Sequence, residues 1–395
     1  MMACISASVP TPVRAQEVSP VVDDRVGAGD VVEPLVPADV EEERHGGLDL
    51  GAVVSAAYDS NIFLSRSEPE SDMVYRVAPT AAYTQGNEKE GEGGFVQIAY
   101  RPTAVVYADH GDDNRIDHQA ALMAGWRGKI TKLTYKGAVQ KLGDATADTG
   151  RQTDRVELAN EIRAAWTPRE KLTVEAAAGN ERSDYADPAL FDSDKTYGEA
   201  AVRFAYSPKT EVGLVYQAGD FKVDRSATQT TRQLTADINW QPREKVRIKL
   251  QAGAEHRKTE NGTDVNPVLE GRADWAPRKG TSLFVTGYQR EEASAFYAGQ
   301  NYNVKGVTAG ISQRLGGKWT ARLEAGREAS TYSQVAGSGA AGRKDRIWFV
   351  RPALECQIND KLDLSIFYRV SDNRSTESDF GYGQRMAGIE LNYKF

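Results

Sequence analysis

Residues 247–255 read RIKLQAGAE, and apolar and polar positions alternate along them without a break. Ile248, Leu250, Ala252 and Ala254 share one parity, while charged residues, glutamine and glycine occupy the other. Successive side chains of a β-strand point to opposite faces, so this stretch predicts a strand with one apolar and one polar face. The same alternation recurs over residues 199–206, 233–240, 269–275, 362–369 and 389–395. Helical periodicity is almost absent, and we predict an all-β chain.

The composition leaves the membrane question open. The chain has 395 residues, of which 40% are apolar and 27% charged, and its mean hydropathy is −0.54. No window approaches the 18 or so uncharged apolar residues of a transmembrane helix, which excludes that class. A transmembrane barrel strand is apolar only at alternate positions, so a low mean hydropathy does not exclude a barrel. The net charge of −7 gives no basic field for nucleic acid.

Two kinds of connection alternate along residues 47–395. Short turns lie at residues 127–129, 168–170, 208–209, 242–244, 277–279, 316–317 and 359–360. Longer polar loops lie at residues 109–116, 143–153, 184–195, 224–230, 259–265, 293–300, 332–344 and 374–383. Short turns at one end and long loops at the other are typical of an up-and-down transmembrane antiparallel β-barrel, here of about 18 strands. No loop is long enough to predict a segment folded into the lumen.

An aromatic–x–Pro–basic pattern repeats before four short turns, as WTPR from Trp166, YSPK from Tyr206, WQPR from Trp240 and WAPR from Trp275. Aromatic rings at one height on every hairpin predict a girdle at a membrane interface, and proline suits position i+1 of a tight turn. A soluble sandwich or propeller would instead bury its aromatic residues at many heights. The predicted periplasmic girdle consists of Tyr83, Trp126, Trp166, Tyr206, Trp240, Trp275 and Phe395.

Charged residues on the polar parity are predicted to line the lumen, because a cation at the bilayer midplane costs roughly 2–4 kcal/mol. The predicted lumen residues are Arg76, Arg101, Lys136, Glu161, Arg163, Glu175, Arg203, Asp237, Arg247, Lys249, Glu270, Arg272, Arg322, Glu324, Arg351, Glu355, Asp363 and Arg369. Barrels of about sixteen to eighteen strands leave an aqueous channel. The mixed sign of these charges suits a neutral or weakly charged polar solute, or a wall locked by ion pairs.

The N-terminal region reads differently from the barrel. Residues 1–15 end near a small-x-small pattern and are interpreted as a truncated export signal, although a disordered tail fits them equally well. Residues 16–46 are acidic and rich in Pro and Val, which predicts a disordered, flexible periplasmic extension. An even number of strands places both ends of the barrel on the periplasmic side.

Nothing in the sequence predicts catalysis, a cofactor or a metal site. The four histidines, His45, His110, His118 and His256, fall in separate segments, so a shared hydrolytic site is not expected. Aspartates make the long loops acidic and could bridge divalent cations to lipopolysaccharide phosphates, although such residues are more often solvated loop charge. These are Asp109, Asp112, Asp113, Asp184, Asp187, Asp192 and Asp194.

Both ends of the predicted barrel carry a family likeness. Residues 58–63 read YDSNIF, and the last hairpin closes the chain on Phe395. Over residues 47–395 these features resemble the outer-membrane barrels of the "β-barrel porin 2" type. The resemblance implies an outer-membrane location among lipid and lipopolysaccharide, with Phe395 read by the barrel assembly machinery. It also implies a passage for an exopolysaccharide, working with a periplasmic polysaccharide export protein.

Three functions therefore remain open from the sequence. The leading one is an outer-membrane channel that passes an exopolysaccharide delivered by a periplasmic partner. The first alternative is a general diffusion porin for small hydrophilic solutes, and the second is a non-conducting structural barrel that anchors an envelope complex. None of the three is an enzyme or involves nucleic acid.

Overall fold

The computed structural model describes residues 46–86, 91–260, 262–333 and 342–395. The predicted export signal, residues 1–15, lies outside the described residues, and so does the predicted extension, residues 16–46, apart from Gly46. The barrel itself begins at Gly46, close to the predicted start at residue 47.

The described residues form 18 β-strands in one sheet. They are β1 (Gly46–Asp59), β2 (Asp72–Gln85), β3 (Gly93–Tyr107), β4 (Arg115–Arg127), β5 (Thr131–Leu142), β6 (Arg155–Arg169), β7 (Leu172–Tyr185), β8 (Ser193–Ser207), β9 (Thr210–Val223), β10 (Gln229–Arg243), β11 (Val246–Thr259), β12 (Gly262–Arg278), β13 (Thr281–Ala293), β14 (Asn301–Gly316), β15 (Trp319–Tyr332), β16 (Lys344–Asn359), β17 (Leu362–Ser375) and β18 (Tyr382–Lys394).

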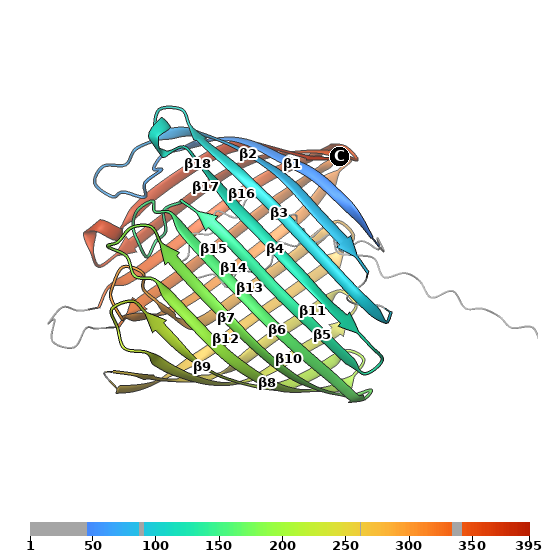
Figure 1. Cartoon of the computed structure of the whole chain (residues 1–395). Helices are drawn as coiled ribbons and strands as arrows, with labels where there is room; N and C mark the ends of the chain where they lie inside the picture. Colours follow the sequence, from blue (N-terminus) through green and yellow to red (C-terminus); the bar gives the residue numbers. More distant parts are fainter. Residues whose placement is uncertain (1–45, 87–90, 261, 334–341) are drawn as a thin grey trace, which may run out of the picture.

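Every strand pairs antiparallel with its sequence neighbours, and β1 pairs with β18, which closes the ring. The β1–β18 register runs from Gly51 opposite Lys394 to Asp59 opposite Met386. The prediction of an all-β, up-and-down barrel of 18 strands is therefore confirmed (Figure 1). Within the described ranges, no helix is long and apolar enough to cross a membrane.

The outward face of the barrel is apolar. Along β9, Val212, Leu214 and Tyr216 are 40%, 55% and 46% exposed, while Val215 between them is only 4% exposed. The same alternation exposes Ile162 on β6. A closed sheet has no free edge, and its backbone groups are satisfied by neighbouring strands, which is what a hydrocarbon surrounding requires. The exposed apolar belt defines a membrane-spanning barrel.

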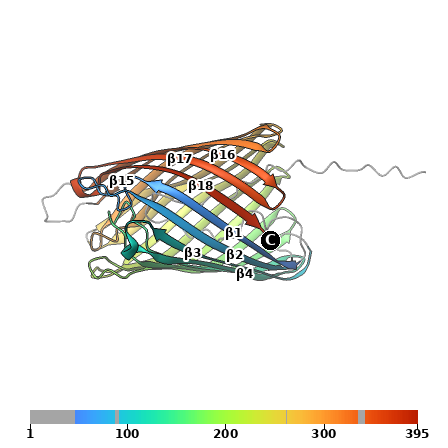
Figure 2. The same ribbon diagram turned by 90° about the horizontal axis from the view of Figure 1, so that it is seen from above.

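The two ends of the barrel differ, as Figures 1 and 2 show. The C-terminus lies at the short-turn end, and the longer loops gather at the opposite end. β1 begins at the short-turn end too, where the Phe395 N–H donates to the Leu50 carbonyl at 3.0 Å. One predicted long loop, residues 259–265, is wrong, because β11 continues to Thr259 and β12 starts at Gly262.

The aromatic–x–Pro–basic repeat builds β-bulges rather than the predicted turn corners. Trp166 pairs with Val174 and Arg169 with Leu172, so Pro168 lies in a bulge inside β6 and the turn follows at residues 170–171. Pro242 in β10 and Pro277 in β12 lie at the equivalent bulges. Proline has no N–H, and a bulge is one of the few strand positions that needs none.

Only the β8–β9 hairpin follows the predicted turn. There Ser207 pairs with Thr210, which leaves Pro208 and Lys209 as the two central turn residues. Proline at the first of these is position i+1, as expected.

The bulges also tie neighbouring hairpins together. The residue after the aromatic donates its N–H to the preceding turn, as from Thr167 to the Ile130 carbonyl at 2.7 Å and from Gln241 to the Lys209 carbonyl at 2.7 Å. Ala276 donates likewise to the Lys245 carbonyl at 2.9 Å. The repeat therefore organises the short-turn rim while it holds each aromatic side chain on the outward parity.

Candidate functional site

The inner wall carries an ion-pair network that extends over β6, β7 and β8. Arg163 lies at its centre, with guanidinium nitrogens 3.0 Å from Glu161, 3.0 Å from Glu175 and 2.7 Å from Glu199. The three carboxylates reach one cation because side chains of the same parity on adjacent strands are neighbours across the sheet.

Arg203 on β8 extends the network. It pairs with Glu175 at 3.3 Å and also with Asp237 on β10. The structure thus brings together five predicted lumen residues, namely Glu161, Arg163, Glu175, Arg203 and Asp237. The sequence left two interpretations of these charges open, a lumen for a weakly charged polar solute and a wall locked by ion pairs. In this part of the barrel the charges form ion pairs within the wall.

Other predicted residues pair more locally. Arg322 contacts Glu355 at 2.8 Å between β15 and β16, and Arg272 contacts Asp274 at 2.8 Å on β12. The Arg101 guanidinium donates to the Gln119 side chain at 2.9 Å.

Two arginines stack on phenylalanine rings of the same wall. The Arg351 guanidinium lies 4.9 Å from the Phe367 ring centre, and Arg369 lies 5.2 Å from that of Phe349. Both contacts fall within the range of cation–π attraction.

The lumen side of β11 and β12 is open. Arg247, Lys249, Glu270 and Arg272 are exposed although they occupy the inward parity, and Lys136 on β5 is exposed in the same way. Side chains that point into a filled barrel would be buried, so these residues face open space inside the ring. Such charged, solvated positions are what an aqueous passage requires.

The last three predicted residues, Arg76, Glu324 and Asp363, are half-buried on the inward parity. All of the predicted lumen residues therefore lie on the face opposite to the apolar belt. Their contact with a solute stays a prediction.

The predicted aromatic girdle lies on the outer surface at the short-turn end. Its exposed fractions range from 40% for Tyr83 to 71% for Tyr206. The members between these limits are Trp126, Trp166, Trp240, Trp275 and Phe395. Trp319 at the start of β15 is 41% exposed and adds a further ring at this end. Contact of these rings with phospholipid head groups stays a prediction.

The β5–β6 loop, residues 143–154, crosses the long-loop end of the barrel. Its Asp148 accepts hydrogen bonds from the Ser294 hydroxyl at 2.9 Å and the Tyr332 hydroxyl at 2.9 Å, and from the Ala295 N–H at 2.7 Å. Ser294 and Ala295 follow β13, and Tyr332 ends β15. In the ring of strands, β5 and β6 lie opposite β14 and β15, so the loop spans the mouth of the lumen.

The sequence-based expectation of no infolded loop is therefore wrong. Residues 143–154 are no longer than ordinary surface loops, so their length does not predict that they cross the lumen. A short loop can cross because β5 and β6 start it at the rim and because partners on the far side, 3 Å or less from Asp148, hold its tip. Those partners are distant in sequence, and a single sequence does not reveal them.

Arg343, immediately before β16, completes the anchor of the loop. Its guanidinium donates to the Asp148 carbonyl at 2.9 Å and to the Ala147 carbonyl, and it pairs with Asp345 at 2.5 Å. The same group lies 3.5 Å from the centre of the Phe380 ring. Arg343 is only 1% exposed, so its charge depends entirely on these partners.

Asp148 is fully enclosed by this arrangement. Burial raises the pKa of its carboxyl above the ordinary value, and Arg343 with the donors from Ala295, Ser294 and Tyr332 offsets only part of this rise. A carboxylate that accepts so many bonds holds the tip in one position, because each unmade bond would leave a buried polar group unsatisfied.

Gly150 lets the loop turn beneath the β17–β18 loop. Its φ is +64°, and an added Cβ would lie 2.9 Å from the Phe380 ring. Its N–H donates to the Thr146 carbonyl at 2.8 Å, which closes the tip on itself. Both the left-handed backbone and the close approach favour glycine here.

The YDSNIF motif shapes the β1–β2 loop. Asn61 is completely buried, and its side chain donates to the Ser65 carbonyl at 2.7 Å and the Gly383 carbonyl at 3.0 Å. Ile62 packs in a buried cluster with Val74 and two other residues of the wall. The motif that carried the family likeness thus joins the loop to β18 and the wall. This loop, residues 60–71, was absent from the predicted long loops.

His110 holds the β1–β2 and β3–β4 loops together and was also missed. Its Nδ1 lies 2.8 Å from Asp72 and its Nε2 lies 2.7 Å from Glu70. The hydrogen bonds to Asp72 and Glu70 raise the pKa of His110. A carboxylate at each nitrogen favours the imidazolium form of the ring.

The other histidines do not assemble a site. His118 lies on β4, where it hydrogen-bonds Tyr100 at 2.9 Å, and His256 lies on β11. In the part of the chain that the structure describes, no group of three or more His, Cys, Asp or Glu side chains is placed to hold a metal ion.

No family model matches the sequence, and no curated protein matches it either. The solved structures give matches in fold. OccAB3 of Acinetobacter baumannii is 9% identical, with a TM-score of 0.50 over 88% of this chain and 99% of that one. OpdQ of Pseudomonas aeruginosa is 11% identical, with a TM-score of 0.49 over 88% and 98%.

The outer membrane protein OpdK of Pseudomonas aeruginosa is 10% identical, with a TM-score of 0.46 over 88% of this chain and 99% of that one. At these identities only the fold can be compared, and of the three only OccAB3 is similar enough to count. That likeness covers nearly the whole of both chains, which agrees with one complete barrel rather than a shared fragment.

Proposed function

We propose that this protein is an outer-membrane channel for small hydrophilic solutes, narrowed at one end by the β5–β6 loop. One observation carries the proposal: a closed barrel holds solvated charges on its inner face while Asp148 holds a loop across its mouth. A transport role without catalysis is part of the proposal.

The outer-membrane placement rests on the architecture of the barrel. Up-and-down barrels with short turns at one end and long loops at the other are the form in which β-proteins cross that membrane. The short-turn end, where both ends of the barrel lie, then faces the periplasm, and the long loops face outward. Phe395 stands at the periplasmic end, in position to be read during assembly by the barrel assembly machinery.

The class of solute follows from the wall. Arg247, Lys249 and Arg272 are exposed beside Glu270, so the open part of the lumen offers both signs of charge. A strongly ion-selective pore would show a ring of one sign. Small polar solutes of low charge suit this mixture best.

Passage of an exopolysaccharide is less well supported than passage of small solutes. A polymer suits an unobstructed lumen, and the β5–β6 loop crosses the mouth of this one. The likeness at YDSNIF still implies the role, together with a periplasmic export partner. A non-conducting anchor is disfavoured because the charged side chains of β11 and β12 are exposed inside the ring.

Swelling of protein-loaded liposomes in neutral sugars of increasing size tests the proposal. We expect rapid swelling with monosaccharides and disaccharides and a steep loss with longer oligosaccharides. The comparison variant replaces residues 144–153 with two glycines and should admit longer sugars. Absence of swelling with every sugar would contradict a channel, and equal rates for short and long sugars would contradict a narrowed one.

A further inference from the structure

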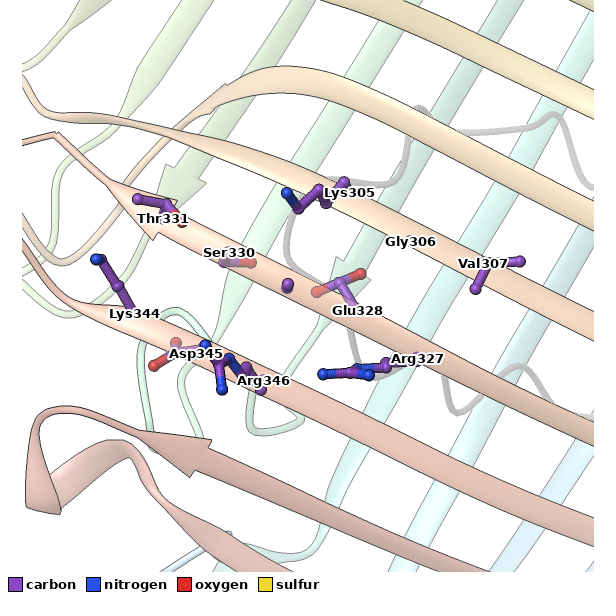
Figure 3. Close-up of a pocket in the computed structure, with 11 residues that line it drawn as sticks. Lys305, Gly306, Val307, Arg327, Glu328, Ser330, Thr331, Lys344, Asp345 and Arg346 are labelled. Atoms are coloured by element: carbon purple, nitrogen blue, oxygen red, sulfur yellow. The ribbon is translucent and has the colours of Figure 1, made fainter.

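Four basic residues cluster on the outer surface near the long-loop end. Lys305 comes from β14, Arg327 from β15, and Lys344 and Arg346 from β16, and all four are exposed (Figure 3). They occupy the outward parity, which carries the apolar belt nearer the middle of the strands. We call this group the β14–β16 basic patch.

The strand register brings these cations together. Lys305 is opposite Ala329, and Ala329 is opposite Arg346 on the next strand. Arg327 is opposite Val307 on one side. Neighbouring strands are about 4.8 Å apart, so long side chains from β14 and β16 converge over the small Ala329.

The patch lacks compensating charge. Within the described ranges, no carboxylate forms an ion pair with any member of the patch. By contrast, Arg182 on β7, at the same end of the outer face, pairs with Asp184 at 2.8 Å. Like charges on adjacent strands repel each other, so an unneutralised group of four destabilises the sheet locally.

The same residues line a hollow. It has a volume of about 660 Å³ and is lined by the four cations, by Val307 and Thr331, and by intervening residues that include Glu328 and Asp345. These two carboxylates occupy the inward parity, where Glu328 accepts a hydrogen bond from the Tyr288 hydroxyl and Asp345 pairs with Arg343. Val307 and Trp348 at its edge are 50% and 40% exposed. An apolar strip continues from there toward the short-turn end, through Ile311 and Leu323 on the outward parity.

A basic patch beside an apolar strip suggests an amphiphilic ligand with an anionic head group and apolar chains. Lys and Arg on the lipid face are costly at the midplane but cost only about 0–1 kcal/mol near an interface, where the long-loop end lies. Arginine binds phosphate through paired, charge-assisted hydrogen bonds. Several phosphates on one headgroup would neutralise several of these cations at once.

We propose that the β14–β16 basic patch binds the phosphorylated sugar headgroup of an outer-leaflet glycolipid of the lipid A type. The acyl chains follow the strip of Val307, Ile311 and Leu323. This site rests on the outer-membrane placement in the proposed function. It also places lipopolysaccharide contact on paired strands, in contrast to the acidic loops that the sequence suggested.

Native mass spectrometry of the detergent-purified barrel tests the proposal, with diphosphoryl lipid A, monophosphoryl lipid A and phosphatidylglycerol as probes. The test variant combines Lys305→Gln, Arg327→Gln and Arg346→Gln. The matched control combines Lys222→Gln, Arg232→Gln and Lys258→Gln, which removes the same charge from exposed outward positions at the same end of β9, β10 and β11.

Wild type and control should each retain one diphosphoryl lipid A. The test variant should bind it about tenfold more weakly or worse, because several charge-assisted contacts are lost. Equal loss in the control, or no loss in the test variant, overturns the site. Equal binding of monophosphoryl lipid A or phosphatidylglycerol by wild type also overturns it, since headgroup recognition would be absent. That wild-type comparison decides the matter even when the test variant does not fold.

Conductance of the same preparations separates the two proposals. The patch lies outside the ring, so its substitution should leave single-channel conductance unchanged. A barrel that binds lipid A without conducting would contradict the channel and leave this site intact. A conducting barrel with unaltered lipid A binding in the test variant would contradict only the site.

Discussion

The substitution Asp148→Ala should release the β5–β6 loop from the barrel mouth. It removes the acceptor of hydrogen bonds from Ser294, Tyr332 and Ala295 and leaves these three donors buried without their partner. Arg343 also loses a nearby anion, although Asp345 still pairs with it at 2.5 Å. Removing one side of a buried charged contact costs about 3–5 kcal/mol.

The size of this change sets the expected result. Because about 1.4 kcal/mol is a factor of ten, the ratio of docked to released loop should fall at least about a hundredfold. The barrel itself should remain folded, since its strand pairing does not depend on the loop. The unitary conductance should rise, and trypsin should cut after Arg151, within the loop, about tenfold faster or more when opening limits cleavage.

The control is Asp187→Ala. Asp187 pairs with Arg151 at 2.7 Å, but both side chains are substantially exposed, at 30% and 45%. An exposed ion pair contributes about 0–1 kcal/mol, so conductance should stay as in wild type. Unchanged conductance and proteolysis in Asp148→Ala would refute the anchoring argument, as would equal effects of the two substitutions.

Three further predictions concern the mouth and the lumen. Gly150→Val should release the same loop, because φ is +64° and the ring of Phe380 leaves no room for a side chain; a conductance equal to wild type would contradict this. The double substitution Arg247→Glu and Lys249→Glu should shift the reversal potential in a salt gradient toward cation preference, and an unchanged potential would show that these side chains do not face the ions. His110 should stabilise the contact between its two loops most strongly below its ordinary pKa of about 6.5. Hydrogen bonds raise its pKa in the folded protein, so the added stability is lost as pH rises through that raised value. The protection of these loops from amide exchange should lose this pH dependence in His110→Gln, and its retention would contradict the assignment.

The strands and their number follow from the sequence because alternation is a local property. Ile248 and Lys249 are consecutive strand residues, so their side chains point to opposite faces whatever the rest of the chain does. Their difference in polarity indicates which of the two faces is apolar. The antiparallel order then needs only the succession of short and long connections. This is why the closure of β1 on β18 agrees with the prediction.

The wrong predictions concern features whose structure depends on contacts between residues that are distant in sequence. Pro168 and Pro242 look like turn residues, yet the paired register of the flanking strands places them in bulges. Asp148 looks like any polar loop residue, and its partners Ser294 and Tyr332 are 146 and 184 positions away in the chain. A single sequence contains no local signal for such pairings.

The unitary conductance of the purified wild-type barrel in a planar lipid bilayer tests the central claim most directly. We predict discrete current steps that scale with salt concentration, with a larger step size when residues 144–153 are replaced by two glycines. A correctly folded barrel that inserts without any unitary current, in both the wild type and the shortened variant, would contradict the existence of an aqueous lumen.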